Sequence, residues 1–174
     1  MNGTLGLNVP SFAPPGSYKI VTKVHDEVSN ADLEMTPAFQ VDAPAVAVPH
    51  GLEIRHFQFS RSDDGPPESD PGFESGATVY MSCNVFGLPF QNDRTSARMS
   101  RKVLGPEGNV LLDAPDFVDL SESSYYRPAT YRVHVRGQLT IPSGMKKGIY
   151  TDQYSVIDNV SNQTITHEAK FEVR

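Results

Sequence analysis

The sequence contains one cysteine, Cys83, in 174 residues. A single cysteine excludes an intrachain disulfide, so the core has to be held together by packing alone. Cys83 alternates with Val79, Met81 and Val85, and this alternation is typical of the buried face of a β-strand. We therefore expect a buried structural thiol, since no base that could activate the sulfur lies nearby in the sequence.

Long apolar runs and an excess of positive charge are also lacking. No stretch approaches the roughly 18 apolar residues that a membrane-spanning helix needs, and the N-terminus lacks the basic and apolar segments of a signal peptide. The chain carries 15 Lys and Arg against 21 Asp and Glu, a net charge of −6, and its positive residues are scattered. These features predict that the chain has no membrane span and no nucleic-acid partner.

Sequence motifs for catalysis are missing as well. The sequence has no nucleophile elbow, no glycine-rich phosphate loop, and no closely spaced pair of histidines or cysteines. The five histidines are dispersed, and those within predicted strands fall mostly on outward positions. The sequence therefore predicts that the chain is not an enzyme and that it uses no cofactor.

The sequence consists mainly of short segments in which apolar and polar residues alternate. These segments are separated by 14 prolines and 13 glycines. None of them has the 3.6-residue period of a helix. Seven segments after the proline-containing stretch 42–50 read as strands, at 52–60, 77–86, 97–104, 109–113, 130–141, 149–158 and 164–173. We expect an all-β fold in which these strands form an antiparallel two-sheet sandwich.

Two local irregularities are predicted within this pattern. Residues 105–109 have the composition of a tight hairpin, since Gly and Asn supply the positive φ angles that such a turn requires. The first strand changes its apolar phase between Ile54 and Phe57, which predicts a β-bulge or a switch between sheets.

An internal repeat is the strongest feature of the sequence. A shift of 132 positions aligns residues 5–41 with residues 137–173 without a gap, and twelve of the 37 aligned positions are identical. We interpret residues 1–41 as the last three strands of one module, residues 42–50 as a linker, and residues 51–174 as a complete second module.

The matched residues predict structural roles. Tyr18 and Tyr150 each follow a glycine by two residues at the start of a strand, and this resembles the tyrosine corner of immunoglobulin-like folds. Asp26 and Asp158 each precede a Val-Ser-Asn turn, where a short carboxylate can accept hydrogen bonds from backbone amides.

With these residues and the seven strands, the chain resembles bacterial immunoglobulin-like or fibronectin-type repeat modules. The resemblance covers residues 52–173 as a strand pattern and implies an immunoglobulin-like sandwich. The disulfide pair and the core tryptophan of true immunoglobulin domains are absent.

Two long connections are candidate functional segments, because long irregular loops in compact domains are often functional. The connection 61–76 carries carboxylates of the kind that calcium prefers, although their spacing fits no EF-hand and solvated surface carboxylates are the favoured interpretation. The calcium candidates are Asp63, Asp64, Glu68 and Asp70.

The connection 114–130 carries aromatic side chains, and the expected strand order places it at the same end of the domain as residues 87–96. Exposed aromatic rings on loops are suited to bind a partner or to cushion a preceding module. The candidate ligand-binding residues are Phe90, Phe117, Tyr125 and Tyr126.

Two functions fit this sequence. The first is a noncatalytic interaction or spacer module of a tandem-repeat protein, outside the cytoplasm or at the cell surface, because arrays of sandwiches give reach and multivalency without chemistry. The second is an accessory carbohydrate- or peptide-binding domain of a larger enzyme. A protein or a carbohydrate is the expected partner in either case.

The incomplete copy predicts one further contact. Residues 1–41 carry apolar positions but lack the strands that would cover them in a full module. Three strands alone bury too little surface to offset their ordering entropy. The covering partner is either the 42–174 domain of the same chain or a second copy, and we favour a homodimer formed through residues 1–41.

Overall fold

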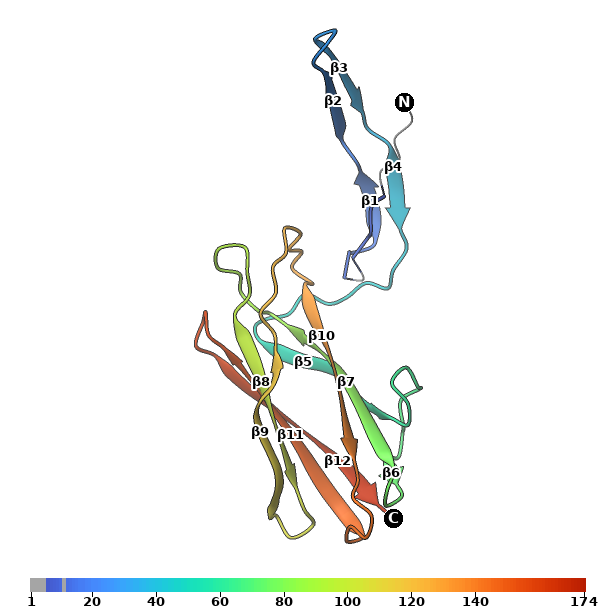
Figure 1. The fold of residues 1–174 in the computed structure, drawn as a ribbon, viewed down its shortest axis with the longest axis vertical. Coiled ribbons are helices and arrows are strands. Elements are labelled where there is room, and N and C mark those ends of the chain that lie inside the picture. The colour runs from blue at the N-terminus through green and yellow to red at the C-terminus, as the bar shows by residue number, and fades with distance from the viewer. Residues whose placement is uncertain (1–5, 11) are drawn as a thin grey trace. The chain divides into compact units, whose positions relative to one another are not determined.

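The computed structural model describes residues 6–10 and 12–174 and divides the chain into two units, Met1–Val48 and Pro49–Arg174 (Figure 1). Strands, turns and irregular segments make up the described residues, and no helix occurs among them. Within the same residues there is accordingly no helix with the length and apolarity that a membrane crossing requires. The expected all-β class is confirmed.

The second unit contains two sheets (Figure 1). Three strands pair antiparallel in the order β10-β7-β5, and five strands lie in the order β6-β12-β11-β8-β9, antiparallel except for β6 beside β12. The strands are β5 (Glu53–Ser60), β6 (Gly72–Phe73), β7 (Thr78–Phe86), β8 (Ala97–Leu104), β9 (Val110–Asp119), β10 (Arg132–Thr140), β11 (Gly148–Asp158) and β12 (Thr164–Val173).

The predicted irregularities are present. The β5–β7 register shifts between Arg55 and Gln58, and His56 between them has a φ of 53°, so the apolar phase changes at a bulge as expected. At the β8–β9 turn, the Gly105 amide donates to the Asn109 carbonyl at 2.8 Å and Gly108 has a φ of 79°. The fourth predicted strand is longer than expected, because β9 continues along β8 as far as Asp119.

The alternating residues of the strands fill the space between the two sheets. Along β7 the residues Val79, Met81, Cys83 and Val85 are all buried. Burial raises the pKa of the Cys83 thiol to about 12, so the sulfur stays protonated and unreactive at neutral pH. The sheets meet through aromatic contacts such as Phe59 of β5 against Phe171 of β12, with ring centroids 5.8 Å apart.

A charged pair lies inside this core. Arg101 of β8 and Asp152 of β11 are 1% and 0% exposed, and their side chains form a two-pronged contact, Nε to Oδ1 at 2.9 Å and Nη2 to Oδ2 at 2.6 Å. The buried hydroxyl of Tyr154 donates to the same carboxylate at 2.6 Å. Arg101 Nη1 donates across to the opposite sheet, to the backbone carbonyl of Gln138 in β10 at 2.9 Å.

We predict that Asp152→Ala lowers the free energy of unfolding by about 3–5 kcal/mol, because it leaves the Arg101 charge buried without a partner. Urea unfolding followed by circular dichroism measures the change. The matched control is Asp113→Ala, which breaks the exposed Lys102–Asp113 ion pair of 3.2 Å between β8 and β9 and should change stability by at most about 1 kcal/mol. Equal effects of the two variants would contradict the prediction.

In the described part of the first unit, four short strands form two sheets. β1 (Gly16–Lys19) pairs with β4 (Ala38–Val41), and β2 (Thr22–Asp26) pairs with β3 (Ala31–Met35). The two pairs are successive parts of one hairpin that is interrupted near Pro37, which lacks the amide hydrogen a ladder needs. Across the interruption the Ile20 amide donates to the Pro37 carbonyl at 3.0 Å.

The hairpin of the first unit has the register of β11 and β12. Tyr18 lies opposite Phe39 in β1–β4, and the residues 132 positions later, Tyr150 and Phe171, lie opposite each other in β11–β12. The two rings stack with centroids 5.6 Å apart and an interplanar angle of 21° in the first pair, and 5.5 Å and 19° in the second. The sequence repeat is therefore also a repeat of strand pairing.

The first of the three strands expected within residues 1–41 is not formed in its described part, since residues 6–10 have no strand assignment. The counterparts of residues 6–8 lie in β10, which pairs with β7, and no strand equivalent to β7 occurs among the described residues of the first unit. Apolar side chains of the hairpin consequently stay exposed. Val24 is 49% exposed, whereas its counterpart Val156 is 0% exposed.

Both tyrosines form the same local contact. The Tyr18 hydroxyl donates to the Pro14 carbonyl at 2.9 Å, and the Tyr150 hydroxyl donates to the Lys146 carbonyl at 2.6 Å, four residues upstream in each case. This is the geometry expected of a tyrosine corner. Tyr150 is 1% exposed, so its hydroxyl has no water to replace a lost backbone acceptor.

We predict that Tyr150→Phe lowers the free energy of unfolding by about 1 kcal/mol, since the ring stays packed and only the hydrogen bond to Lys146 is lost. The urea midpoint of the second unit measures the loss. Tyr18→Phe is the control, because it makes the same change in a hairpin whose apolar side is uncovered, and it should leave that midpoint unchanged. An unchanged midpoint in Tyr150→Phe would argue against the corner as a stabilising contact.

The two aspartates cap equivalent turns. Asp26 Oδ1 accepts the amide of Val28 at 2.9 Å, and Asp158 Oδ1 accepts the amide of Val160 at 3.0 Å. The pKa of Asp26 is lowered mainly by the hydrogen bond from the Ser29 hydroxyl. The hydrogen bonds from the amides of Val28 and Ser29 lower it further. The carboxylates thus set the same turn in both copies.

Candidate functional site

The outer side of the β10-β7-β5 sheet carries a continuous set of polar side chains, which we call the polar face. Because side chains alternate along a strand, β7 directs one set of residues into the core and the other set outward. Strand register aligns the outward residues in three rows across the sheet. The rows are Gln138–Tyr80–Ser60, Arg136–Ser82–Gln58 and His134–Asn84–Arg55.

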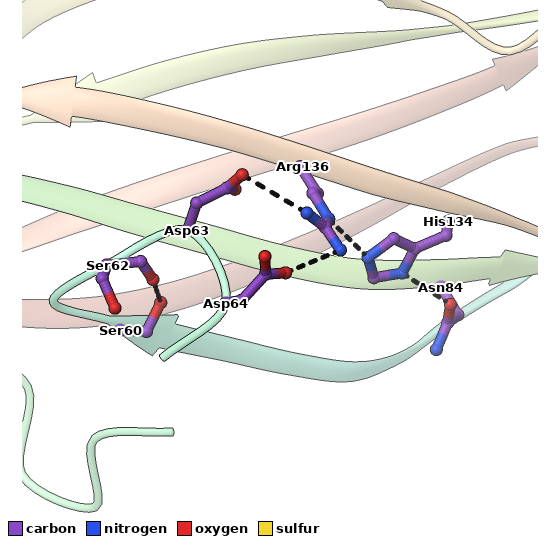
Figure 2. A network of polar contacts seen from close by, with 7 residues as sticks. All are labelled: Ser60, Ser62, Asp63, Asp64, Asn84, His134 and Arg136. Carbon is purple, nitrogen blue, oxygen red and sulfur yellow. Dashed lines mark hydrogen bonds and ion pairs between the residues drawn. The ribbon is translucent and has the colours of Figure 1, made fainter. Parts of the chain in front are cut away.

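A tight turn after β5 brings two carboxylates onto this face. The Ser60 hydroxyl donates to the Ser62 carbonyl at 2.7 Å, and the Gly65 amide donates to the same carbonyl at 3.1 Å. Asp63 and Asp64 lie at the tip of the turn and point toward the side chains of β10 (Figure 2). The first part of the connection 61–76 is therefore held in place by the end of the strand before it.

A series of contacts crosses three strands of the polar face, and Figure 2 shows its part from Asp63 and Asp64 to Asn84. Arg136 contacts Asp63 at 3.3 Å and Asp64 at 2.9 Å, and its Nε donates to Nε2 of His134 at 3.2 Å. His134 Nδ1 lies 3.0 Å from Oδ1 of Asn84, and Nδ2 of Asn84 lies 3.2 Å from Nδ1 of His56. These six side chains thus connect the turn to the bulge of β5.

The hydrogen-bond donors in this series of contacts define the protonation state of His134. Arginine can only donate, so Nε2 of His134 accepts and its proton resides on Nδ1, which donates to the Asn84 amide oxygen. Burial lowers the pKa of His134, and the charges of Arg136 and Arg132 lower it further, although Asp63 and Asp64 oppose them. The neutral imidazole is the form that the polar face stabilises.

We predict that His134 titrates below its ordinary pKa of 6.5 and that Arg136→Gln raises this pKa toward the ordinary value. Because the folded pKa is depressed, the unfolded chain takes up this proton first, and stability falls as the pH drops through 6.5. Histidine ring signals in an NMR titration give the pKa directly. His167, whose pKa is lowered by burial, is the internal reference, and an equal shift of both histidines in Arg136→Gln would contradict the assignment.

Each of the calcium candidates is paired with an arginine. Asp63 and Asp64 share Arg136, whereas Glu68 contacts Arg61 at 3.0 Å. Asp70 contacts Arg174 at 2.5 Å, beside Gly72, whose carbonyl accepts a hydrogen bond from Arg61 at 2.8 Å. Within residues 6–10 and 12–174, no group of three His, Cys, Asp or Glu side chains is arranged to hold a metal ion.

The four aromatic candidates do not form one surface. Phe117 lies in β9 rather than in a loop, and its ring faces the Arg101 guanidinium at 5.3 Å and Tyr154 at 6.2 Å. Phe90 packs edge-on against Tyr131 at 4.8 Å.

The remaining two candidates are exposed. Tyr125 is 97% exposed and Tyr126 is 37% exposed, and Arg127 beside them lies over the Phe90 ring at 4.8 Å.

Sequence reasoning identified Asp63 and Asp64 but not the residues that they contact. Alternation along residues 130–141 places His134 and Arg136 on the outward side of a strand and says nothing more about them. Their contacts with Asn84 and Asp63 span 50 and 73 positions of the sequence, so alternation alone gives no sign of them. The available signal was the row of large polar residues on one side of β10, where solvent-facing positions need no particular residue type.

Comparison with known proteins identifies no family. No protein-family model matches the sequence, and no curated protein matches it significantly. One similar solved structure is the Pseudomonas fluorescens alkylpurine DNA glycosylase AlkC bound to DNA containing an abasic site analog. That match has a TM-score of 0.48 and 12% identity, and it covers 71% of this chain and 30% of the glycosylase.

A second similar structure is a family 123 glycoside hydrolase from Clostridium perfringens, described for glycolipid glycan hydrolysis. The match has a TM-score of 0.43 and 11% identity, and it covers 60% of this chain and 23% of the hydrolase. The chain therefore spans less than a third of either protein. Neither likeness assigns an activity or a ligand to this chain.

These two structures correct two expectations. The sequence predicted that the chain is not an enzyme, and both similar structures are enzymes. It also predicted no nucleic-acid partner, and one of the two is bound to DNA. Both exclusions were wrong as drawn, because the motifs and charge of one domain do not limit the protein in which such a domain occurs.

Proposed function

We propose that the chain is part of a tandem array of immunoglobulin-like β-sandwich modules, which act as interaction or spacer units of a protein outside the cytoplasm. The observation that carries the proposal is the duplicated hairpin. Two segments 132 positions apart have the same strand register, the same tyrosine contact and the same aspartate cap. Repeats of this kind form modules that each bury their own core.

The two sheets of the second unit support the immunoglobulin-like assignment. Seven long strands form two antiparallel layers with a common core, and a tyrosine corner precedes the last hairpin. The first unit offers only the hairpin of such a module, with its apolar side uncovered. A module of this design needs the strands equivalent to β5–β10 to complete it.

We predict that residues 6–41 complete a module when those strands are supplied in the same chain. In an engineered chain, residues 42–137 precede residues 6–174, so that the hairpin of the first unit follows its own set of strands. The hairpin carries Ile20 and Thr22 where β11 has Asp152 and Tyr154, so Ile20→Asp with Thr22→Tyr restores the partners of Arg101. Hydrogen exchange should then show the amides of β2 protected, as those of β11 are.

The same engineered chain without the two substitutions is the control. It leaves the first copy of Arg101 buried opposite Ile20 without a carboxylate, so β2 should be protected less. Residues 42–174 at the end of either chain report that the downstream module is intact. Rapid exchange of β2 in the substituted chain, beside a protected β11, would contradict the repeat-module proposal.

The polar face favours a second candidate, an accessory ligand-binding domain of a larger protein. The side chains of the polar face form a connected network of hydrogen bonds and ion pairs. The solvent-facing residues of a spacer do not need such a network, whereas a ligand-binding surface does. A spacer and a ligand-binding module share the same scaffold, so both functions are compatible with the duplicated hairpin.

A further inference from the structure

A shallow hollow lies on the polar face, lined by Asp63, Tyr80, Arg136, Gly137 and Gln138. Tyr80 lies directly opposite Gln138 in the β7–β10 ladder, so the tyrosine ring and the glutamine amide are neighbours across the strands. Among the residues that the structure describes, neither the Tyr80 hydroxyl nor the Gln138 side-chain amide has a hydrogen-bond partner. The hollow therefore offers unused donors and acceptors beside an aromatic ring.

The charges around the hollow select against ionic ligands. Arg136 would attract an anion, but its guanidinium already contacts Asp63 and Asp64, whose carboxylates repel the same anion. A cation meets the opposite conflict, because it would approach Arg136 together with the carboxylates. An uncharged ligand meets neither repulsion and can still hydrogen-bond to both kinds of group.

The hollow is also held in shape before any ligand arrives. Arg136 is fixed by Asp63, by Asp64 and by His134, and the turn that carries the aspartates is closed by the Gly65 amide. Side chains that are already ordered lose little entropy on binding. Fixed planar groups suit neighbouring hydroxyls, which donate to a carboxylate and accept from a guanidinium or an amide.

We propose that this hollow binds a neutral, hydroxyl-rich ligand, a sugar unit of a glycan. Arg136, Asp63 and Gln138 hydrogen-bond to the ring hydroxyls, and the apolar C–H side of the sugar packs on the Tyr80 ring. This inference goes beyond the repeat-module function and does not depend on it, because the hollow lies wholly within β7, β10 and the turn after β5.

The test uses the whole chain, labelled with 15N, and a panel of neutral oligosaccharides built from glucose, galactose, mannose or xylose. Polygalacturonate oligomers and inorganic phosphate are the charged probes. At millimolar concentrations we expect at least one neutral oligosaccharide to shift the amide signals of Tyr80, Gly137 and Gln138. The charged probes should leave these signals unchanged.

Two variants locate the binding. Tyr80→Ala removes the ring and the hydroxyl, and Gln138→Ala removes the amide but keeps the backbone carbonyl that Arg101 needs. Each should weaken the binding of the active oligosaccharide by about tenfold or more. Tyr125→Ala, which removes the most exposed aromatic ring of the other candidate surface, is the matched control and should leave the affinity unchanged.

Three results would overturn the assignment. The first is no shift of these amides with any neutral probe, in a chain whose spectrum shows the second unit folded. The second is a response to the charged probes only. The third is binding that Tyr125→Ala abolishes and Gln138→Ala does not. Because the engineered tandem chain tests the repeat by hydrogen exchange alone, failure of one proposal leaves the other standing.

Discussion

The buried pair of Arg101 and Asp152 constrains the second unit more than any other contact. A buried charge is costly unless it is paired and hydrogen-bonded, and the partners of Arg101, which lies in β8, come from β11 and β10. The guanidinium also faces the rings of Phe117 and Tyr154. Strands of both sheets must therefore be in register at once for this group to be satisfied.

The same contact links the core to the polar face. Arg101 holds the backbone carbonyl of Gln138, and the side chain of Gln138 lines the hollow on the outer side of the same strand. Gly137 beside it allows the close approach of Phe117, since a Cβ there would lie 2.4 Å from that ring. The inner side of β10 thus fixes the positions of the outer residues.

Much of the fold follows from local pattern, and the candidate site does not. Alternation located the strands and the bulge at His56, and the repeat located the hairpin of the first unit. The third predicted strand did contain a signal of the buried pair, because Arg101 occupies an inward position between Met99 and Val103. Its partner lies 51 residues away, and no periodicity connects two single charges over that distance.

The duplicated hairpins are alike in shape but not interchangeable in chemistry. A hairpin of the first kind, docked into the core of the second unit, would put Ile20 where Arg101 requires a carboxylate. Tandem repeats of similar sequence are prone to exchange equivalent strands with their neighbours while they fold. Only the β11–β12 hairpin carries the carboxylate that neutralises Arg101, so exchange with the hairpin of the first unit is unfavourable. The buried pair thus makes the second unit selective for its own hairpin.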